Sequence, residues 1–310
     1  MTSSGPATPP ADWSALLRQA AATLRAAGVD SPRADAELLL SHLLGGDRGT
    51  LLARVLAGAA PGPGQAEAFG ALVERRAVRE PLQHITGAAA FHGLTLEVGP
   101  GVFVPRPETE LLVEEGIRAL AVLDGPARVV DLCTGSGAIA AAVAAWAEER
   151  HRDVAVTAVE REDAALAWAR RNLEPRGVDL RQGDALVACA DLDGTVDVVL
   201  SNPPYVPDAE LPVQAEALAD PPTALYGGDA AGLRIPRGII ARAAGLLRPG
   251  GRLVMEHHEA QGEALAAEAR LGGRFEDVRV LPDHTGRERF LAAVRTGALV
   301  APPSDGRMEP

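Results

Sequence analysis

The residue pattern with the clearest chemical meaning is Asn202-Pro203-Pro204-Tyr205, which follows the apolar run Val196–Leu200. The whole chain contains two asparagines and two tyrosines, and this tetrapeptide uses one of each. Two successive prolines after a strand remove N–H donors and stiffen the chain. The Asn202 side-chain oxygen and the Pro203 carbonyl remain as acceptors, and two fixed acceptors suit the two hydrogens of a planar NH₂ group. The pattern predicts a site for an amide or aryl-amine nitrogen, although a merely rigid loop would also use it.

Such a nitrogen is a poor nucleophile, because its lone pair is delocalised and no side chain deprotonates it at neutral pH. When the protein accepts hydrogen bonds from both N–H groups, electron density returns to the nitrogen and its lone pair points toward an electrophilic carbon. The protein thus contributes orientation and preorganised electrostatics. Tyr205 can cover the planar group by stacking. We infer that the electrophile is the methyl group of a sulfonium, which needs no metal. A thiol nucleophile at Cys133 or Cys189 is the alternative, but Cys133 is more simply a small residue in a turn.

A second pattern, Asp131-Leu132-Cys133-Thr134-Gly135-Ser136-Gly137, joins a buried strand to a helix. Small residues in such a turn let backbone N–H groups approach a ligand at a helix N-terminus. The next two predicted strands end in acids, Glu160 and Asp184. A carboxylate at the position of Glu160 can accept hydrogen bonds from ribose hydroxyls, and Asp184 is placed to meet an adenine amino group. Each feature also has a purely structural interpretation: a tight turn, a solvated acid and a helix N-cap.

The elements that must position these residues alternate between strand and helix. We expect helices at 138–149, 163–172, 235–247 and 261–269, strands at 154–159, 178–182, 196–200 and 252–256, and a final strand pair at 275–281 and 289–294. This alternation predicts a parallel sheet with helices on both faces. Ligands of open α/β sheets bind beyond the carboxyl ends of the strands, where the predicted site residues fall.

The N-terminal part of the chain has a different pattern. Apolar residues recur at helical spacing from about Asp12 to Arg79, which predicts a small helical bundle. The alternation from Ile85 to Val104 predicts a β-hairpin, and the segment Pro105–Glu110 opens a helix. We therefore expect a helical domain at 1–84, a hairpin linker at 85–105, a catalytic domain at 106–297 and a disordered tail at 298–310.

Composition and charge exclude several classes of protein. The 310 residues are 47% hydrophobic and 23% charged, which is typical of a globular protein. No apolar run is long enough for a membrane span, and the polar, proline-rich N-terminus is unlike a secretory signal. Two cysteines provide neither a disulfide framework nor a zinc set, so we expect no metal and a cytoplasmic location. The net charge of −12 argues against a partner held mainly through phosphates.

These residues together resemble the S-adenosylmethionine-dependent methyltransferases, and specifically the bacterial release factor glutamine methyltransferases. The resemblance extends from Arg79 to about Thr296. Besides the Asn202 loop and the glycine turn, it rests on the stretches 80–87, 103–110, 220–228 and 248–251. It implies an α/β fold, namely a Rossmann-like class I methyltransferase domain with a small N-terminal helical bundle and a connecting β-hairpin.

The resemblance also implies an activity. The family transfers a methyl group from S-adenosylmethionine to N5 of the Gln in the Gly-Gly-Gln loop of class 1 peptide chain release factors, which leaves S-adenosylhomocysteine and modulates translation termination. The helical domain would dock the release factor, and we expect a monomer. The implied catalytic residues are Asn202 and Pro203, and the implied substrate-binding residues are Asn202, Pro203, Pro204 and Tyr205. The implied cofactor-binding residues are Cys133, Thr134, Gly135, Ser136, Gly137, Glu160, Asp184, Ala185 and Asn202.

Two departures and three alternatives accompany this prediction. Many family members carry Gly at the position of Cys133 and a bulky aromatic at that of Ala185, so we predict only a backbone contact with adenine at Ala185. The Asn-Pro-Pro-aromatic element also serves enzymes that methylate exocyclic amino groups of nucleic-acid bases, and another protein's Gln is a further substrate. Base methylation favours a basic face with aromatic surfaces, whereas this chain is acidic and has 3% aromatics. A catalytically silent binding module is the third alternative, against which the intact Asn202 loop and glycine turn argue.

Overall fold

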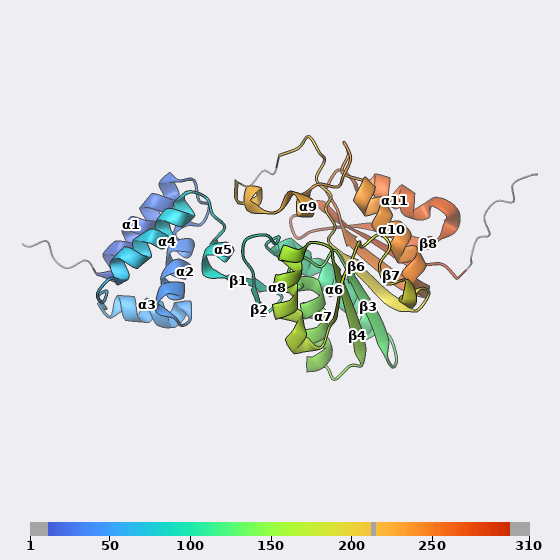
Figure 1. Cartoon of the computed structure of the whole chain (residues 1–310), viewed down its shortest axis with the longest axis horizontal. Coiled ribbons are helices and arrows are strands. Elements are labelled where there is room, and N and C mark those ends of the chain that lie inside the picture. Colours follow the sequence, from blue (N-terminus) through green and yellow to red (C-terminus); the bar gives the residue numbers. More distant parts are fainter. Residues whose placement is uncertain (1–11, 212–214, 298–310) are drawn as a thin grey trace, which may run out of the picture. The chain divides into compact units, whose positions relative to one another are not determined.

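The computed structural model describes residues 12–211 and 215–297, and the chain forms two compact units (Figure 1). Of the described residues, the helical unit contains 12–87 and 215–219, and the sheet unit contains 88–211 and 220–297. The tail predicted at 298–310 lies outside the described residues. The helical unit therefore includes a short segment that is distant in sequence from its helices.

Amphipathic helices build the helical unit. They are α1 (Trp13–Ala26), α2 (Pro32–Leu44), α3 (Arg48–Leu56), α4 (Gln65–Ala77) and the short α5 (Leu82–Thr86). Helices α1 and α3 begin after aspartates that accept a hydrogen bond from an N–H three residues later, Asp12 at 2.6 Å and Asp47 at 2.9 Å. In the core, Trp13 and Phe69 meet edge to face at 5.9 Å between ring centroids. The predicted helical bundle is confirmed.

A cluster of charged side chains holds the 3₁₀ segment Ala215–Ala219 within the helical unit. Arg76 donates to Asp35 Oδ2 at 2.8 Å and to Glu216 Oε1 at 2.7 Å. Arg79 donates to both carboxylate oxygens of Glu216 at 2.8 and 2.7 Å. Bidentate Arg–carboxylate pairs combine charge with directional bonding. Sequence reasoning missed this cluster, because Glu216 lies 140 residues from Arg76.

The hairpin between the two parts of the chain is shorter than predicted and belongs to the sheet unit. Strands β1 (Ala88–Phe91) and β2 (Leu94–Glu97) pair antiparallel around the predicted turn at His92-Gly93. The side chain of Asn172 accepts from the N–H of Glu97 at 2.8 Å and donates to the carbonyls of Glu97 and Ser136 at 2.9 Å each. Helix α5 crosses the boundary drawn after residue 84, and our division into domains remains a prediction.

One sheet organises the other unit, with the strand order β5-β4-β3-β6-β7-β9-β8. The strands are β3 (Ala127–Leu132), β4 (Val154–Glu160), β5 (Asp179–Gln182), β6 (Val196–Ser201), β7 (Leu247–Glu256), β8 (Phe275–Pro282) and β9 (Glu288–Arg295). Strands β3 to β7 pair parallel, as predicted. The predicted final pair adds an antiparallel edge, since only five residues connect β8 to β9 and a parallel crossover needs a much longer connection.

Helices cover both faces of this sheet (Figure 1). They are α6 (Glu110–Ala121), α7 (Ala138–Glu149), α8 (Asp163–Leu173), the short α9 (Pro222–Leu225), α10 (Arg234–Leu246) and α11 (Gly262–Arg270). Neighbouring residues of β3 serve opposite faces: Val129 packs in the cluster with α6 and α7, and Val130 in the cluster with α10 and α11. Within the described residues, we find no helix with both the length and the apolar character that crossing a bilayer requires.

Candidate active site

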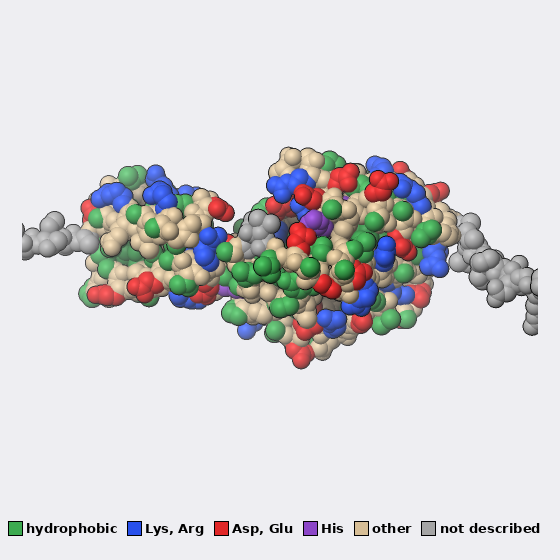
Figure 2. Space-filling view, turned by 90° about the horizontal axis from the view of Figure 1, so that it is seen from above, with side chains coloured by type: hydrophobic (Ala, Val, Ile, Leu, Met, Phe, Trp, Pro, Cys, Tyr) green, Lys and Arg blue, Asp and Glu red, His purple; other side chains and the backbone are tan. Residues whose placement is uncertain are grey.

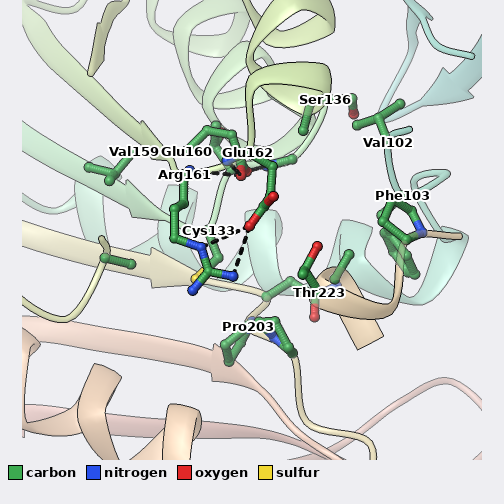
Figure 3. A pocket seen from close by; sticks show the side chains of 18 of the residues that line it. Val102, Phe103, Cys133, Ser136, Val159, Glu160, Arg161, Glu162, Pro203 and Thr223 are labelled. Atoms are coloured by element: carbon green, nitrogen blue, oxygen red, sulfur yellow. Dashed lines mark hydrogen bonds and ion pairs between the residues drawn. The ribbon is translucent and has the colours of Figure 1, made fainter. Parts of the chain in front are cut away.

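A cavity of the sheet unit lies at the carboxyl ends of β3, β4, β5 and β6. After β3 the chain builds one side of the sheet with β4 and β5 and then crosses to β6, so the cavity occupies the point where ligands of doubly wound sheets bind. Figure 3 shows Cys133, Glu160 and Pro203 around this cavity, with Val102, Phe103 and Thr223 contributed by other segments. The predicted site residues that line it are Cys133, Thr134, Gly135, Ser136, Glu160, Asp184, Ala185, Asn202, Pro203, Pro204 and Tyr205.

The turn from β3 to α7 has a backbone that explains its small residues. Cys133 and Gly135 lie in the left-handed region, at φ +64° and +58°. Gly137 is not among the residues that line the cavity. A Cβ atom on Gly137 would lie 2.8 Å from Leu173 Cγ, so this glycine permits close packing of α7 against α8. The turn thus contains residues that face the cavity and one that serves helix packing.

The thiols of this protein are poor candidates for nucleophiles. Burial raises the pKa of Cys133, and nearby Glu160 and Asp131 raise it further. Burial also raises the pKa of Cys189. A thiol is nucleophilic only as the thiolate, which these surroundings disfavour. The geometry therefore favours the sequence interpretation of Cys133 as a small turn residue.

Glu160 ends β4 and is held by three backbone N–H groups. Its Oε2 accepts from Gly135 at 2.8 Å, and its Oε1 accepts from Arg161 and Glu162 at 2.8 Å each. Burial raises the pKa of this carboxyl, and the three N–H bonds oppose that rise. Arg161 and Glu162 form an ion pair beside it (Figure 3). Because each carboxylate oxygen can accept a further bond, Glu160 retains acceptor capacity at the cavity wall.

Asp184 lines the cavity and also forms a hydrogen bond within the turn after β5. Its Oδ1 accepts from the N–H of Leu186 at 2.9 Å, and because no helix begins here, the predicted helix N-cap is not formed. The same residue lines the cavity beside Ala185, whose methyl group is buried. Asp184 and Ala185 follow β5, which is the neighbour of β4, so they lie next to Glu160 on the same side of the cavity.

Asn202 directly follows β6 and takes part in a chain of hydrogen bonds. Its Nδ2 donates to Thr109 Oγ1 at 3.1 Å, and that hydroxyl donates to Glu256 Oε2 at 2.7 Å. The Tyr205 hydroxyl donates to the other oxygen of Glu256 at 3.0 Å. Within the described residues, Asn202 Oδ1 accepts no hydrogen bond. This oxygen therefore remains as an acceptor on a side chain that lines the cavity.

A second contact ties together two stretches that the sequence singled out without assigning a role. Asp220 Oδ2 accepts from Arg106 Nη2 at 2.6 Å, and its Oδ1 accepts from the N–H of Val104 at 3.2 Å. The side chain of Asp220 is fully buried in this arrangement. These bonds place the segment 102–109 next to the segment 220–225, and both contribute residues to the cavity.

Sequence reasoning missed Glu256 as a residue of this region. The signal that could have revealed it is the one used for Glu160, an acid at the carboxyl end of a predicted parallel strand. Thr109 lies in a stretch that carries the family resemblance, but its partners come from β6 and β7, far along the chain. Its role is visible only once the strands are neighbours.

Comparison with known proteins assigns the chain to a family. A family model described as the PrmC N-terminal domain matches residues 15–87, and one described as the Methyltransferase small domain matches residues 100–228. The release factor glutamine methyltransferase of Bifidobacterium longum is 44% identical over 294 residues, covering 90% of this chain and 98% of that protein. The chain belongs to the release factor glutamine methyltransferase family.

Two other members of the family match this chain over a similar share of its length. The release factor glutamine methyltransferase of Streptomyces coelicolor is 47% identical over 283 residues, covering 90% of this chain and 96% of that protein. That of Deinococcus radiodurans is 42% identical over 286 residues, covering 91% and 98%. The similarity to these release factor glutamine methyltransferases thus covers both the helical unit and the sheet unit.

Proposed function

We propose that this protein transfers the methyl group of S-adenosylmethionine to N5 of the Gln in the Gly-Gly-Gln loop of class 1 peptide chain release factors, and so modulates translation termination. The observation that carries the proposal is the side chain of Asn202. Its NH₂ group is engaged by Thr109, and its oxygen remains as an acceptor in the same cavity as the glycine turn and Glu160. An amide substrate needs such an acceptor.

The chain's own residues act on the substrate amide by orientation. Asn202 Oδ1 accepts one N–H of the Gln side chain, and the Pro203 carbonyl accepts the other. Positive charge develops on the nitrogen as its bond to the methyl carbon forms and the carbon–sulfur bond of the sulfonium breaks. The nitrogen then loses its proton to solvent, so no strong base is required. Preorganised acceptors of this kind stabilise charge that develops in the transition state. Tyr205 and Pro204 line the cavity beside them and cover the planar amide.

The residues of the cavity fit S-adenosylmethionine. Glu160 is a buried carboxylate with acceptor capacity, which suits two ribose hydroxyls. The turn Cys133–Ser136 precedes the N-terminus of α7, which favours a carboxylate. Asp184 and Ala185 border the place for the adenine amino group. When bound, the cofactor would supply a methyl electrophile, and Asn202 lines the same cavity as these residues.

We assign the docking of the release factor to the helical unit, and we expect a monomer that acts in the cytoplasm, where translation terminates. The site residues all lie in the sheet unit, which leaves the core and surface of the helical unit without a role in the chemistry. Hydrogen exchange of the full chain, with and without a release factor, tests this assignment. Protection within residues 12–87 is expected, and protection confined to the sheet unit would contradict it.

Methylation of a nucleic-acid base is the competing function. On the face seen in Figure 2, basic and acidic side chains are interspersed over the sheet unit, and the chain carries a net charge of −12. Nucleic-acid binding is dominated by attraction between phosphates and clustered cations. The charge distribution therefore favours a protein substrate.

A labelling experiment separates these functions. The purified protein is incubated with methyl-labelled cofactor and, in parallel, with a class 1 release factor, the same factor with the loop Gln replaced by Ala, and total RNA. Label is expected only in the first reaction. Equal labelling of the Ala form would show that the methylated residue is not the loop Gln. Labelling of RNA alone would establish the competing function.

A further inference from the structure

The carboxyl group of Glu256 is buried at the end of β7, and each of its oxygens is bound by a hydroxyl. Oε2 accepts from Thr109 and Oε1 accepts from Tyr205. The residue is 2% exposed, and within the described residues it forms no ion pair. Burial raises its pKa, the two hydroxyl bonds and the charge of Arg289 oppose that rise, and Glu108 adds to it. A buried carboxylate with no direct ion pair is costly to keep, so its presence here needs an explanation.

The direction of these bonds determines the direction of the next one. A carboxylate only accepts, so both hydroxyls must donate to it. The single hydrogen of Thr109 is then used, and its oxygen can only accept. Asn202 must therefore present its NH₂ group to Thr109, as the 3.1 Å contact from Nδ2 shows. The amide oxygen necessarily points the other way.

This direction matters because the two ends of an asparagine amide have almost the same shape. Rotating the amide of Asn202 by half a turn would preserve its packing but place two N–H donors toward the cavity. The NH₂ group of the substrate also donates, so the Asn202 NH₂ group would face it and could not accept either of its hydrogen bonds. Shape alone does not select between the two orientations, whereas a fixed hydrogen-bond direction does.

We propose that Glu256 and Thr109 are positioning residues, which hold the Asn202 amide with its oxygen toward the substrate nitrogen. The inference rests on the proposed function of Asn202 as an acceptor for the target amide. Tyr205 is bound to the same carboxylate, so one buried anion orients both the acceptor side chain and the aromatic ring beside it. Neither Glu256 nor Thr109 contacts the reacting atoms in this scheme.

The first test is kinetic and uses the full-length protein with saturating cofactor. Thr109→Val removes the hydroxyl with little change of shape, and we expect single-turnover methyl transfer to fall roughly 10- to 100-fold, as for other groups that orient a site residue. Thr109→Ser keeps the hydroxyl and is expected to restore most of the rate. Thr157→Val removes a different buried threonine, on β4 and outside the cavity, and serves as the control. Cofactor affinity should stay within about threefold in all variants, because the altered step is methyl transfer.

The second test asks whether Thr109 acts through Asn202. In the Asn202→Ala background there is no amide to orient, so adding Thr109→Val should cause no further loss of rate. Losses that multiply, or a Thr109→Val single variant with the wild-type rate, would overturn the proposal. Glu256→Gln adds an NH₂ donor that can turn the Thr109 hydroxyl toward Asn202, so it should reduce the rate as Thr109→Val does.

A third measurement reports the amide directly and does not depend on turnover. The chain contains two asparagines, so labelling with ¹⁵N-asparagine yields two side-chain NH₂ signals. The signal lost in Asn202→Ala identifies Asn202, and Asn172, bound to two carbonyls, is the internal reference. Thr109→Val and Glu256→Gln should shift the Asn202 signal and leave that of Asn172 in place. An unmoved Asn202 signal would contradict the proposed contact.

The wild-type protein separates failure of this inference from failure of the proposed function. If label enters RNA and not the release factor, the proposed function fails, and the same variants are measured on RNA. The order of their rates should persist, because any amino-group substrate needs the Asn202 oxygen. If the wild-type protein labels neither substrate, both proposals are overturned.

Discussion

Glu216 in the helical unit and Glu256 in the sheet unit are both largely removed from solvent, yet their partners differ in kind. Burial disfavours the charge of Glu216, but hydrogen bonds from Arg79 and Arg76 outweigh it and lower the pKa from 4.5 to about 2. Burial raises the pKa of Glu256, and the hydroxyls of Thr109 and Tyr205, together with the charge of Arg289, oppose this rise only in part. Glu216 forms direct ion pairs, whereas Glu256 is bound by hydroxyls and feels the charge of Arg289 without a direct ion pair.

We infer from this difference that a buried charge can serve stability in one region and orientation in the other. Guanidinium groups compensate the charge of Glu216 and anchor the segment 215–219 to α4 and the residues that follow it. Hydroxyl donors leave the charge of Glu256 poorly compensated but transmit a bond direction to their other neighbours. Glu160 resembles Glu256, since its donors are neutral backbone N–H groups at the cavity wall. We therefore expect substitutions in the two regions to affect different measurements.

The largest expected effect is on turnover, at Asn202. Asn202→Ala removes one acceptor where the nitrogen must gain electron density, and single-turnover transfer at saturating cofactor should fall about 10²–10³-fold. Asn202→Asp keeps an oxygen but adds a charge, and it should retain more activity than Ala and less than wild type. A near-wild-type rate for Asn202→Ala would remove this side chain from the mechanism.

Glu160→Ala should weaken cofactor binding by about 1.5–3 kcal/mol, because hydrogen bonds to a charged acceptor are lost. The ribose is bound equally in ground and transition states, so turnover at saturating cofactor should change little. Calorimetric titration with the cofactor measures the affinity. Glu174→Ala, an exposed acid beyond α8, is the matched control and should leave the affinity unchanged. An unchanged affinity in Glu160→Ala would make this residue a structural acid.

Glu216→Gln should reduce the free energy of unfolding by about 1–2 kcal/mol at pH 7, since Arg76 is buried but Arg79 is partly exposed. The folded-state pKa is lower than the unfolded value of 4.5, so the stabilisation is present above pH 4.5 and is lost as the pH falls toward 2. Denaturant unfolding at several pH values should show wild type and variant converging below pH 4.5. Glu67→Gln, an exposed acid of α4, is the control, and a constant difference across this range would contradict the ion-pair account.

Cys133→Gly should raise the free energy of unfolding by about 0.5–1 kcal/mol. Glycine relieves the cost of the left-handed backbone at φ +64°, and this gain exceeds the entropy that glycine adds to the unfolded chain. Cys133→Ala keeps a Cβ atom and hence the strain, so it should bring no such gain. Equal unfolding midpoints for the Gly and Ala variants would show that the backbone angle is not what limits stability there.

The smallest expected change in stability is at Glu256. It is the most direct test of the difference between Glu216 and Glu256. A folded pKa above the unfolded value means that the ionised carboxyl costs stability as the pH rises through this range. Glu256→Gln removes the buried charge, and at pH 7 its unfolding free energy should equal or slightly exceed that of wild type while transfer is impaired. A loss as large as that of Glu216→Gln would mean that both carboxylates serve stability.

Local pattern was sufficient for most of the fold. Helix α7 has the predicted limits, and β4, β6 and α8 differ from prediction by a residue or so, because each is determined by the spacing of apolar residues along one segment. The long hairpin predicted at 85–104 was wrong in length, since β1 and β2 comprise four residues each. Its alternation continues past the paired residues into a loop where Val98, Val102 and Val104 are buried without strand pairing.

Most of the candidate site could also be predicted from the chain, for a physical reason. Cys133, Glu160, Asp184 and Asn202 each come at the end of a predicted parallel strand, and the carboxyl ends of parallel strands share one edge of a sheet. Residue type and position along the chain therefore implied a common location. Gly137 shows the limit of this reasoning, because its neighbour Leu173 comes from another helix.

The amino-acid sequence was enough to predict the chemistry from the Asn202 oxygen and the Pro203 carbonyl as acceptors, a glycine turn, and an acid at the end of a neighbouring strand. Folding in three dimensions decided which end of the Asn202 amide faces the cavity, because that depends on Thr109 and Glu256, from η1 (Pro107–Thr109) and β7. It also decided which carboxylate meets cations and which meets hydroxyls. Spacing along a chain can place a residue on an edge or a face, but the direction of a hydrogen bond depends on neighbours that are a hundred or more residues away.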